Sequence, residues 1–155
     1  MAQGMGEEWG DIGLAALFHI TEADVAEVRD LQLVKEKVRW KQLSNYRFHI
    51  DIDGHTSSFS GLFRKLLSGG LVLKVQSPEG CRPWYYDQLV SGVNFVPVSS
   101  DLSDLVDIVS YYRERPRLAE SIAQRGRALA LTLTYEKEFA SALRTVTRAF
   151  AAANP

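Results

Sequence analysis

The feature that most constrains the fold is the run of residues 47–67, where a strand pattern, a small-residue loop and a helix pattern follow one another. Phe48, Ile50 and Ile52 alternate with polar residues, as in a strand with one packed face. The glycine after Asp53 ends this strand, because glycine tolerates backbone angles that β-branched residues do not adopt.

The loop and the helix start in this run predict a site for an anion. Ser57, Ser58 and Ser60 can cap the helix predicted over residues 58–67. Free N–H groups at a helix start attract anions. A strand, a small-residue loop and a helix start also form the place where α/β proteins bind phosphates.

The rest of the chain alternates strand and helix patterns over short links. Strands of buried type are predicted over residues 71–75 and 94–98. Longer helices are predicted over residues 21–31, from about 102 onward, over 117–131 and over 134–152. Short helices are predicted within residues 35–45 and 84–89. This alternation favours an α/β fold with a parallel sheet and right-handed crossovers. The helical tail from about Ser100 is expected to pack on one face of that sheet.

Composition excludes several classes of function. The formal net charge of −1 offers no overall attraction for nucleic acid, and no apolar run is long enough to span a bilayer. Cys81 is the only cysteine, so an internal disulfide is excluded, and His19, His49 and His55 lack the spacing of metal ligands. His49 alternates with the apolar strand residues and is expected to face outward. We expect a cytoplasmic chain, peripheral to a membrane at most, without a metal.

Four blocks follow one another in an order and spacing shared with one enzyme family. In these blocks the chain resembles glycosyltransferase family 90, which includes protein O-glucosyltransferases, capsule-associated xylosyltransferases and bacterial lipopolysaccharide-modifying enzymes; the bacterial members are most similar. The blocks are YRFHIDIDG at 46–54, SSFSGLFRKLL at 57–67, LVLK at 71–74 with WYYDQL at 84–89, and VNFVPVSSDLSDL at 93–105, with IAQRG at 122–126 downstream.

The resemblance implies a GT-B architecture, in which two Rossmann-like domains flank the active site. Residues 46–155 would form the second, donor-binding domain, with a helical C-terminal tail. Residues 1–45 would be a lead-in, whose own pattern favours a short strand or a helix start over 13–20 and then a helix. The implied activity is inverting transfer from a nucleotide sugar such as UDP-glucose or UDP-xylose, without a further cofactor. The implied acceptor is a polysaccharide, a lipopolysaccharide or a glycoprotein.

The resemblance places residues 57–62 against the donor's diphosphate and sugar, and neighbouring polar residues are candidates by their positions. These residues lie in the loop, the helix start and the next strand: Asp53, Gly54, His55, Ser57, Ser58, Phe59, Ser60, Gly61, Arg64 and Lys74. Asp51 and Asp53 share one face of the strand. Asp53 would either bind the donor sugar or form a turn with Gly54. Asp51 would either contact the ligand or pair with a basic neighbour.

The chain departs from the family pattern in three places. Leu62 stands where many members have an arginine, with Arg64 two residues on, and Ser91 and Gly92 stand where many have Pro-Trp. The family's catalytic base lies in the first Rossmann domain, and about 45 residues are too few for such a domain. The chain therefore resembles a truncated, donor-binding half or a degenerate paralogue, and no catalytic residue is assigned.

Two other interpretations stay open. The chain could be a non-catalytic Rossmann-like module that binds a nucleotide sugar or a partner chain, or a different α/β enzyme that is similar in fold alone. Expected partners are a missing N-terminal half or a second copy of the chain.

Overall fold

The computed structural model describes residues 21–37, 39–53, 58 and 60–153. The chain forms two compact units, residues 1–43 and 44–155. In the first unit, helix α2 (Glu22–Asp30) begins with a capping box, in which Thr21 Oγ1 accepts from Asp24 N and Asp24 Oδ2 accepts from Thr21 N, both at 3.2 Å. The predicted helix is thus confirmed. The strand predicted over 13–20 lies outside the described residues.

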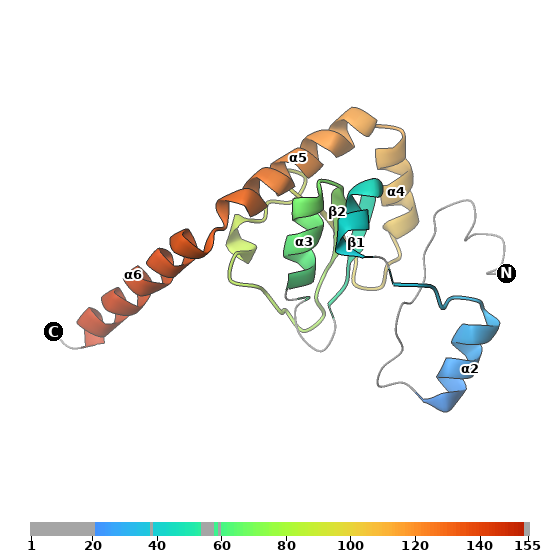
Figure 1. Ribbon diagram of the computed structural model, residues 1–155, viewed down its shortest axis with the longest axis horizontal. Coiled ribbons are helices and arrows are strands. Elements are labelled where there is room, and N and C mark those ends of the chain that lie inside the picture. Colours follow the sequence, from blue (N-terminus) through green and yellow to red (C-terminus); the bar gives the residue numbers. More distant parts are fainter. Residues whose placement is uncertain (1–20, 38, 54–57, 59, 154–155) are drawn as a thin grey trace. The chain divides into compact units, whose positions relative to one another are not determined.

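The second unit is built on a parallel sheet of three described strands in the order β1-β2-β3 (Figure 1). They are β1 (Phe48–Asp51), β2 (Leu71–Val75) and β3 (Val96–Val98). The predicted α/β fold is confirmed. Pro97 lies in β3, at the edge of the three strands, where a missing N–H costs least.

Helices cover both faces of this sheet. On one face α3 (Ser60–Ser68) packs Leu62 and Leu66 against Val72, beside the short helix η2 (Tyr86–Gln88). On the other face α4 (Leu105–Arg113) and α5 (Pro116–Thr132) cover the odd-numbered residues of β2. The sheet therefore forms the middle of three layers, with a hydrophobic core on each side. The short helix η1 (Trp40–Asn45) precedes β1.

The prediction that His49 faces outward is wrong. Its residue is 5% exposed, and its Nε2 lies 2.7 Å from Ser68 Oγ of α3. Ser68 donates its own proton to the Lys65 carbonyl at 2.6 Å, so it accepts from His49. Polar residues mark the solvent side of a strand only where one face is wet, whereas both faces of this parallel sheet are covered.

The helical tail does not stay on one face. Ile122 of α5 packs with α4, whereas Ala130 joins the core under α3. A helix of 17 residues is about 25 Å long, and three strands span roughly 10 Å, so α5 passes from one face to the other. Gly126 permits this crossing, because an added Cβ would lie 2.5 Å from Asn94 O and 2.9 Å from Leu66 Cδ2.

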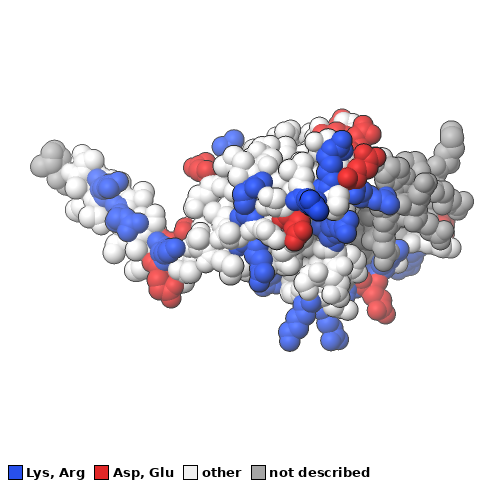
Figure 2. All heavy atoms as spheres, turned by 90° about the horizontal axis from the view of Figure 1, so that it is seen from above, with Lys and Arg blue, Asp and Glu red and all other residues white. Residues whose placement is uncertain are grey.

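The first residue of α4 differs from the prediction, whereas the bounds of the last helix agree with it closely. Helix α4 begins at Leu105 rather than at about 102, because Leu102 adopts a left-handed φ of 61° that a helix cannot include. Helix α6 (Tyr135–Ala153) follows the predicted bounds closely but contains no buried residue. Tyr135 and Phe150 in α6 are 76% and 71% exposed. Figure 2 shows Lys and Arg side chains over much of the face it displays, with fewer Asp and Glu side chains among them.

Candidate functional site

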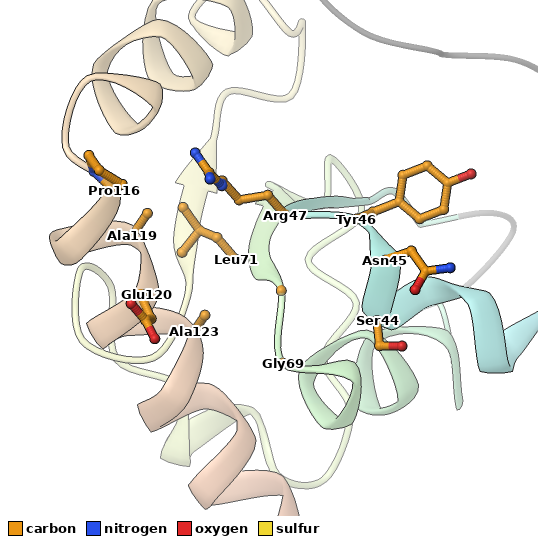
Figure 3. Close-up of a pocket in the computed structure, with 11 residues that line it drawn as sticks. Ser44, Asn45, Tyr46, Arg47, Gly69, Leu71, Pro116, Ala119, Glu120 and Ala123 are labelled. Carbon is orange, nitrogen blue, oxygen red and sulfur yellow. The ribbon is translucent and has the colours of Figure 1, made fainter.

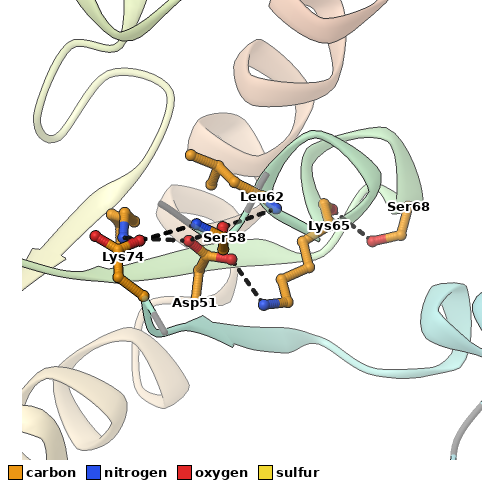
Figure 4. A network of polar contacts seen from close by, with 7 residues as sticks. Asp51, Ser58, Leu62, Lys65, Ser68 and Lys74 are labelled. Carbon is orange, nitrogen blue, oxygen red and sulfur yellow. Dashed lines mark hydrogen bonds and ion pairs between the residues drawn. The ribbon is translucent and has the colours of Figure 1, made fainter. Parts of the chain in front are cut away.

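A group of four charged side chains lies where β1 and β2 end, under the start of α3 (Figure 4). This charge cluster consists of Asp51, Asp53, Lys65 and Lys74. Lys74 Nζ lies 2.7 Å from Asp53 Oδ1 and 3.3 Å from Asp51 Oδ2. Lys65 Nζ lies 2.7 Å from Asp51 Oδ1. The formal charges of the cluster cancel, which reduces the cost of burying them.

The cluster is almost completely buried. The side chains of Asp51, Lys74 and Asp53 are 0%, 3% and 7% exposed, and that of Lys65 is 21% exposed. Strand register brings the central pair together, because Asp51 pairs with Lys74 across the parallel strands. Side chains at paired positions point to the same face of a sheet. The predicted pairing of Asp51 with a basic neighbour is confirmed.

Ser58 connects the cluster to helix α3. Its Oγ donates to Asp51 Oδ2 at 2.9 Å and accepts from Leu62 N at 3.2 Å, and its N–H donates to Asp53 Oδ1 at 3.1 Å. The predicted capping role is therefore confirmed for Ser58. Gly61 N also donates to Ser58 O at 2.7 Å. Two N–H groups of the first turn are thus satisfied within the protein, and an anion at this end would use others.

The two carboxylates of the cluster differ in how completely they are hydrogen-bonded. Both oxygens of Asp51 accept hydrogen bonds, whereas Asp53 Oδ2 is buried and accepts none from the described residues. Burial opposes the charge on Asp53, but the Lys74 and Ser77 side chains and the Ser58 N–H together hold its pKa below the usual value. Ser77 nevertheless lacks the geometry of a hydrogen bond to Oδ2.

The described residues of the predicted donor site fall at this edge of the sheet. Asp53, Ser58 and Lys74 contact one another directly, and Ser60 and Gly61 begin α3. Arg64 lies on the exposed side of α3. Gly54, His55, Ser57 and Phe59 lie outside the described residues. Donor binding by these ten residues stays a prediction.

Two side chains of this region lie inside the protein. Lys74 points at the carboxylates of Asp51 and Asp53, and its side chain is 3% exposed. Leu62, at the position that the resemblance gives to an arginine, is 1% exposed and packs in the core. Lys65 was not identified from the sequence as part of the site. Its position one helical turn after Gly61, on the side of α3 that faces β1, could have indicated the contact with Asp51.

A cavity of about 350 Å³ lies at the opposite edge of the sheet (Figure 3). It is lined by Arg47, just before β1, by Leu71, the first residue of β2, and by Ala119 and Glu120 of α5. These positions are at the amino ends of the strands. In open α/β sheets ligands bind at the carboxyl ends, so the charge cluster rather than this cavity is the candidate ligand site.

The family model described as glycosyl transferase family 90 matches residues 15–138. The chain belongs to this family. It is 36% identical over 55% of its length to uncharacterized protein 035R of Invertebrate iridescent virus 3, of which it covers 8%. It is 27% identical over 79% of its length to human protein O-glucosyltransferase 3, of which it covers 23%. The chain thus spans less than a quarter of each of these relatives.

The fold is similar to that in the crystal structure of Anabaena Alr3699/HepE in complex with UDP-glucose. The TM-score is 0.57 at 20% identity, and the match covers 84% of this chain and 39% of that one.

None of the helices in the described part of the chain is both long and apolar enough to cross a membrane. Within the same part, no group of three or more His, Cys, Asp and Glu residues is arranged to hold a metal ion.

Proposed function

We propose that residues 44–155 bind the nucleotide-sugar donor, a UDP-sugar, of an inverting glycosyltransferase of family 90. Membership of the family over residues 15–138 supports glycosyl transfer as the reaction class. The HepE complex supports a nucleotide sugar as the ligand, because a protein of similar fold holds UDP-glucose.

The observation that carries the proposal is the charge cluster at the carboxyl ends of β1 and β2. It fixes Ser58, and with it the start of α3, beside Asp53. A strand end joined to a helix start is where open α/β sheets receive phosphorylated ligands. Helix α3 points its positive end toward this edge.

Glycosyl transfer places negative charge on the departing diphosphate. The N-terminal end of α3 and the Ser60 hydroxyl would stabilise this charge, and Arg64 on the exposed side of the same helix would add a cation. No metal is required for this step, because fixed dipoles and a side-chain cation oppose the developing charge. Lys74 is assigned no contact with phosphate, since its ammonium is engaged by two carboxylates.

The proposal assigns donor binding to this chain and acceptor activation to a part of the family architecture beyond the matched segment. In the GT-B arrangement a carboxylate on the other Rossmann-like domain would take the proton from the acceptor hydroxyl, whose oxygen then attacks the anomeric carbon as the diphosphate leaves. The acceptor would be a polysaccharide, a lipopolysaccharide or a glycoprotein.

Titration calorimetry of the chain with UDP-glucose, UDP-xylose and GDP-mannose tests the proposal. We expect a UDP-sugar to bind with a dissociation constant below about 1 mM and the guanosine compound to bind at least tenfold more weakly. Ser58→Ala and Arg64→Ala should weaken binding, and Lys137→Met in α6 is the matched surface control. The absence of binding by every UDP-sugar would refute the donor site. Binding without any transfer by the complete enzyme would favour the non-catalytic module.

A further inference from the structure

Asp53 has a buried carboxylate oxygen to which none of the described residues donates a hydrogen bond. Its side chain is 7% exposed, and its Oδ2 accepts no hydrogen bond from the described residues. A buried polar atom without a partner costs free energy, on the order of 1–3 kcal/mol. Such an atom at a site edge therefore indicates a missing donor group.

The contacts of Asp53 keep this oxygen in place. Lys74 Nζ and Ser58 N both donate to the other oxygen, Oδ1, at 2.7 and 3.1 Å. Lys74 is itself held, because Asp51 Oδ2 also lies 3.3 Å from its ammonium. Two donors on one oxygen, one of them anchored by a second carboxylate, fix the plane of the Asp53 carboxylate and present Oδ2.

The chemistry of the missing group follows from the charge on Asp53. An ionised carboxylate only accepts hydrogen bonds, and it repels phosphate oxygens. The group that completes Oδ2 therefore carries an O–H or N–H and no negative charge. In a UDP-sugar the hydroxyls of the transferred sugar and of the ribose meet this description and lie near the diphosphate, whereas the uracil N3–H meets it at a greater distance from the diphosphate.

We propose that Asp53 Oδ2 accepts a hydrogen bond from a carbohydrate hydroxyl of the donor, and that Lys74 is the positioning residue that presents it. The inference rests on the proposed function and deepens it. In this proposal Lys74 does not make the contact with the donor that the sequence predicted, but orients the Asp53 carboxylate that makes one.

Binding of UDP-glucose and of UDP to four variants tests the proposal. Asp53→Asn keeps an oxygen for the Ser58 N–H and replaces the free acceptor with a donor, so UDP-glucose affinity should fall at least tenfold, about 1.4 kcal/mol. Lys74→Met should show a similar loss. Lys65→Met removes a lysine contact of Asp51 but none of Asp53, so its loss should be clearly smaller. Lys137→Met is the surface control. A loss confined to UDP-glucose assigns the hydroxyl to the transferred sugar. An equal loss with UDP assigns the donor group to the nucleoside, and in that case an equal loss with ribose 5-phosphate assigns it to the ribose, whereas no loss with ribose 5-phosphate assigns it to the uracil and overturns the carbohydrate hydroxyl.

Two readouts separate positioning from a general structural role. If Lys74 acts through Asp53, the double variant should bind no more weakly than Asp53→Asn alone, and fully additive losses would overturn the role of Lys74. Lys74 also lowers the pKa of Asp53, so acidification should weaken UDP-glucose binding by Lys74→Met at a higher pH than in the wild type. Because Asp53→Asn preserves the shape of the side chain, it tests the acceptor even if Lys74→Met does not fold.

The outcomes distinguish this inference from the proposed function. Wild-type chain that binds neither UDP-glucose nor UDP would refute the proposed function and the inference with it. Wild-type binding that Asp53→Asn leaves unchanged would overturn the inference alone. An equal loss in Lys65→Met and Lys74→Met would also overturn it, because the cluster would then act only as a structural unit.

Discussion

Mild acid should destabilise the second unit through His49. Its ring is buried between β1 and α3, where Nε2 donates to Ser68 Oγ at 2.7 Å. Burial, followed by the charge of Lys65, lowers the pKa of His49 from 6.5 to about 4. The native protein thus resists protonation at a pH where the unfolded chain accepts the proton.

The sign and size of the effect follow from this difference. A base whose pKa falls on folding stabilises the native state fully above pH 6.5, and this contribution is lost as the pH decreases toward 4. The separation between these pKa values, at roughly 1.4 kcal/mol per pH unit, corresponds to a maximum of roughly 3–4 kcal/mol. About 2 kcal/mol of this should be lost by about pH 5. Asp53 does not obscure the result, since its lowered pKa matters only in more acidic solution.

Urea unfolding of wild type and His49→Gln at about pH 7.5 and pH 5 measures this contribution, and an NMR titration of His49 gives its pKa directly. We expect wild type to lose about 2 kcal/mol between the two conditions, and His49→Gln to lose much less. Equal losses in the two proteins, or a measured pKa near 6.5, would refute the interpretation of His49 as a buried neutral base.

Three further substitutions test the packing of the site and the core by urea unfolding. Lys74→Met should cost about 3 kcal/mol, because it leaves Asp53 buried without its cation; a cost under about 1 kcal/mol would contradict the described burial. Gly126→Ala should cost about 1–3 kcal/mol despite the better helix propensity of alanine, because the new Cβ would meet Asn94 O at 2.5 Å; a gain in stability would show that α5 lies farther from the sheet. Gly61→Ala should instead stabilise by up to about 1 kcal/mol, because its Cβ finds only contacts of 3.5 Å or more; if stability rises while UDP-glucose binding is lost, the ligand approaches Gly61 closely.

Periodicity along the chain was sufficient to predict the strands and most helices. Residues 71–75 form a strand with the predicted bounds, since five consecutive buried residues in a short run admit few other structures. The capping box at Thr21 and Asp24 located the start of α2 because its hydrogen bonds are local. Such signals depend only on neighbours in sequence.

The site depended on information that the sequence pattern does not carry. The register that pairs Asp51 with Lys74, and the crossing of α5 to the second face, involve contacts distant in sequence. The wrong prediction for His49 has the same cause. Alternation along a strand indicates that it has two faces, but it does not indicate that a helix covers the polar face. The strand end and Ser58 were therefore predictable, whereas the presentation of Asp53 Oδ2 was not.

The central claim is that a UDP-sugar binds at the carboxyl ends of β1 and β2. Backbone chemical shifts of the labelled chain, recorded while UDP-glucose is added, test it most directly. The account predicts that the largest changes occur at Asp53, Ser58 and Gly61, with little change at Arg47 and Glu120 beside the cavity at the other edge. Changes that gather around Arg47 and Glu120 instead, or no changes at saturating UDP-glucose, would contradict it.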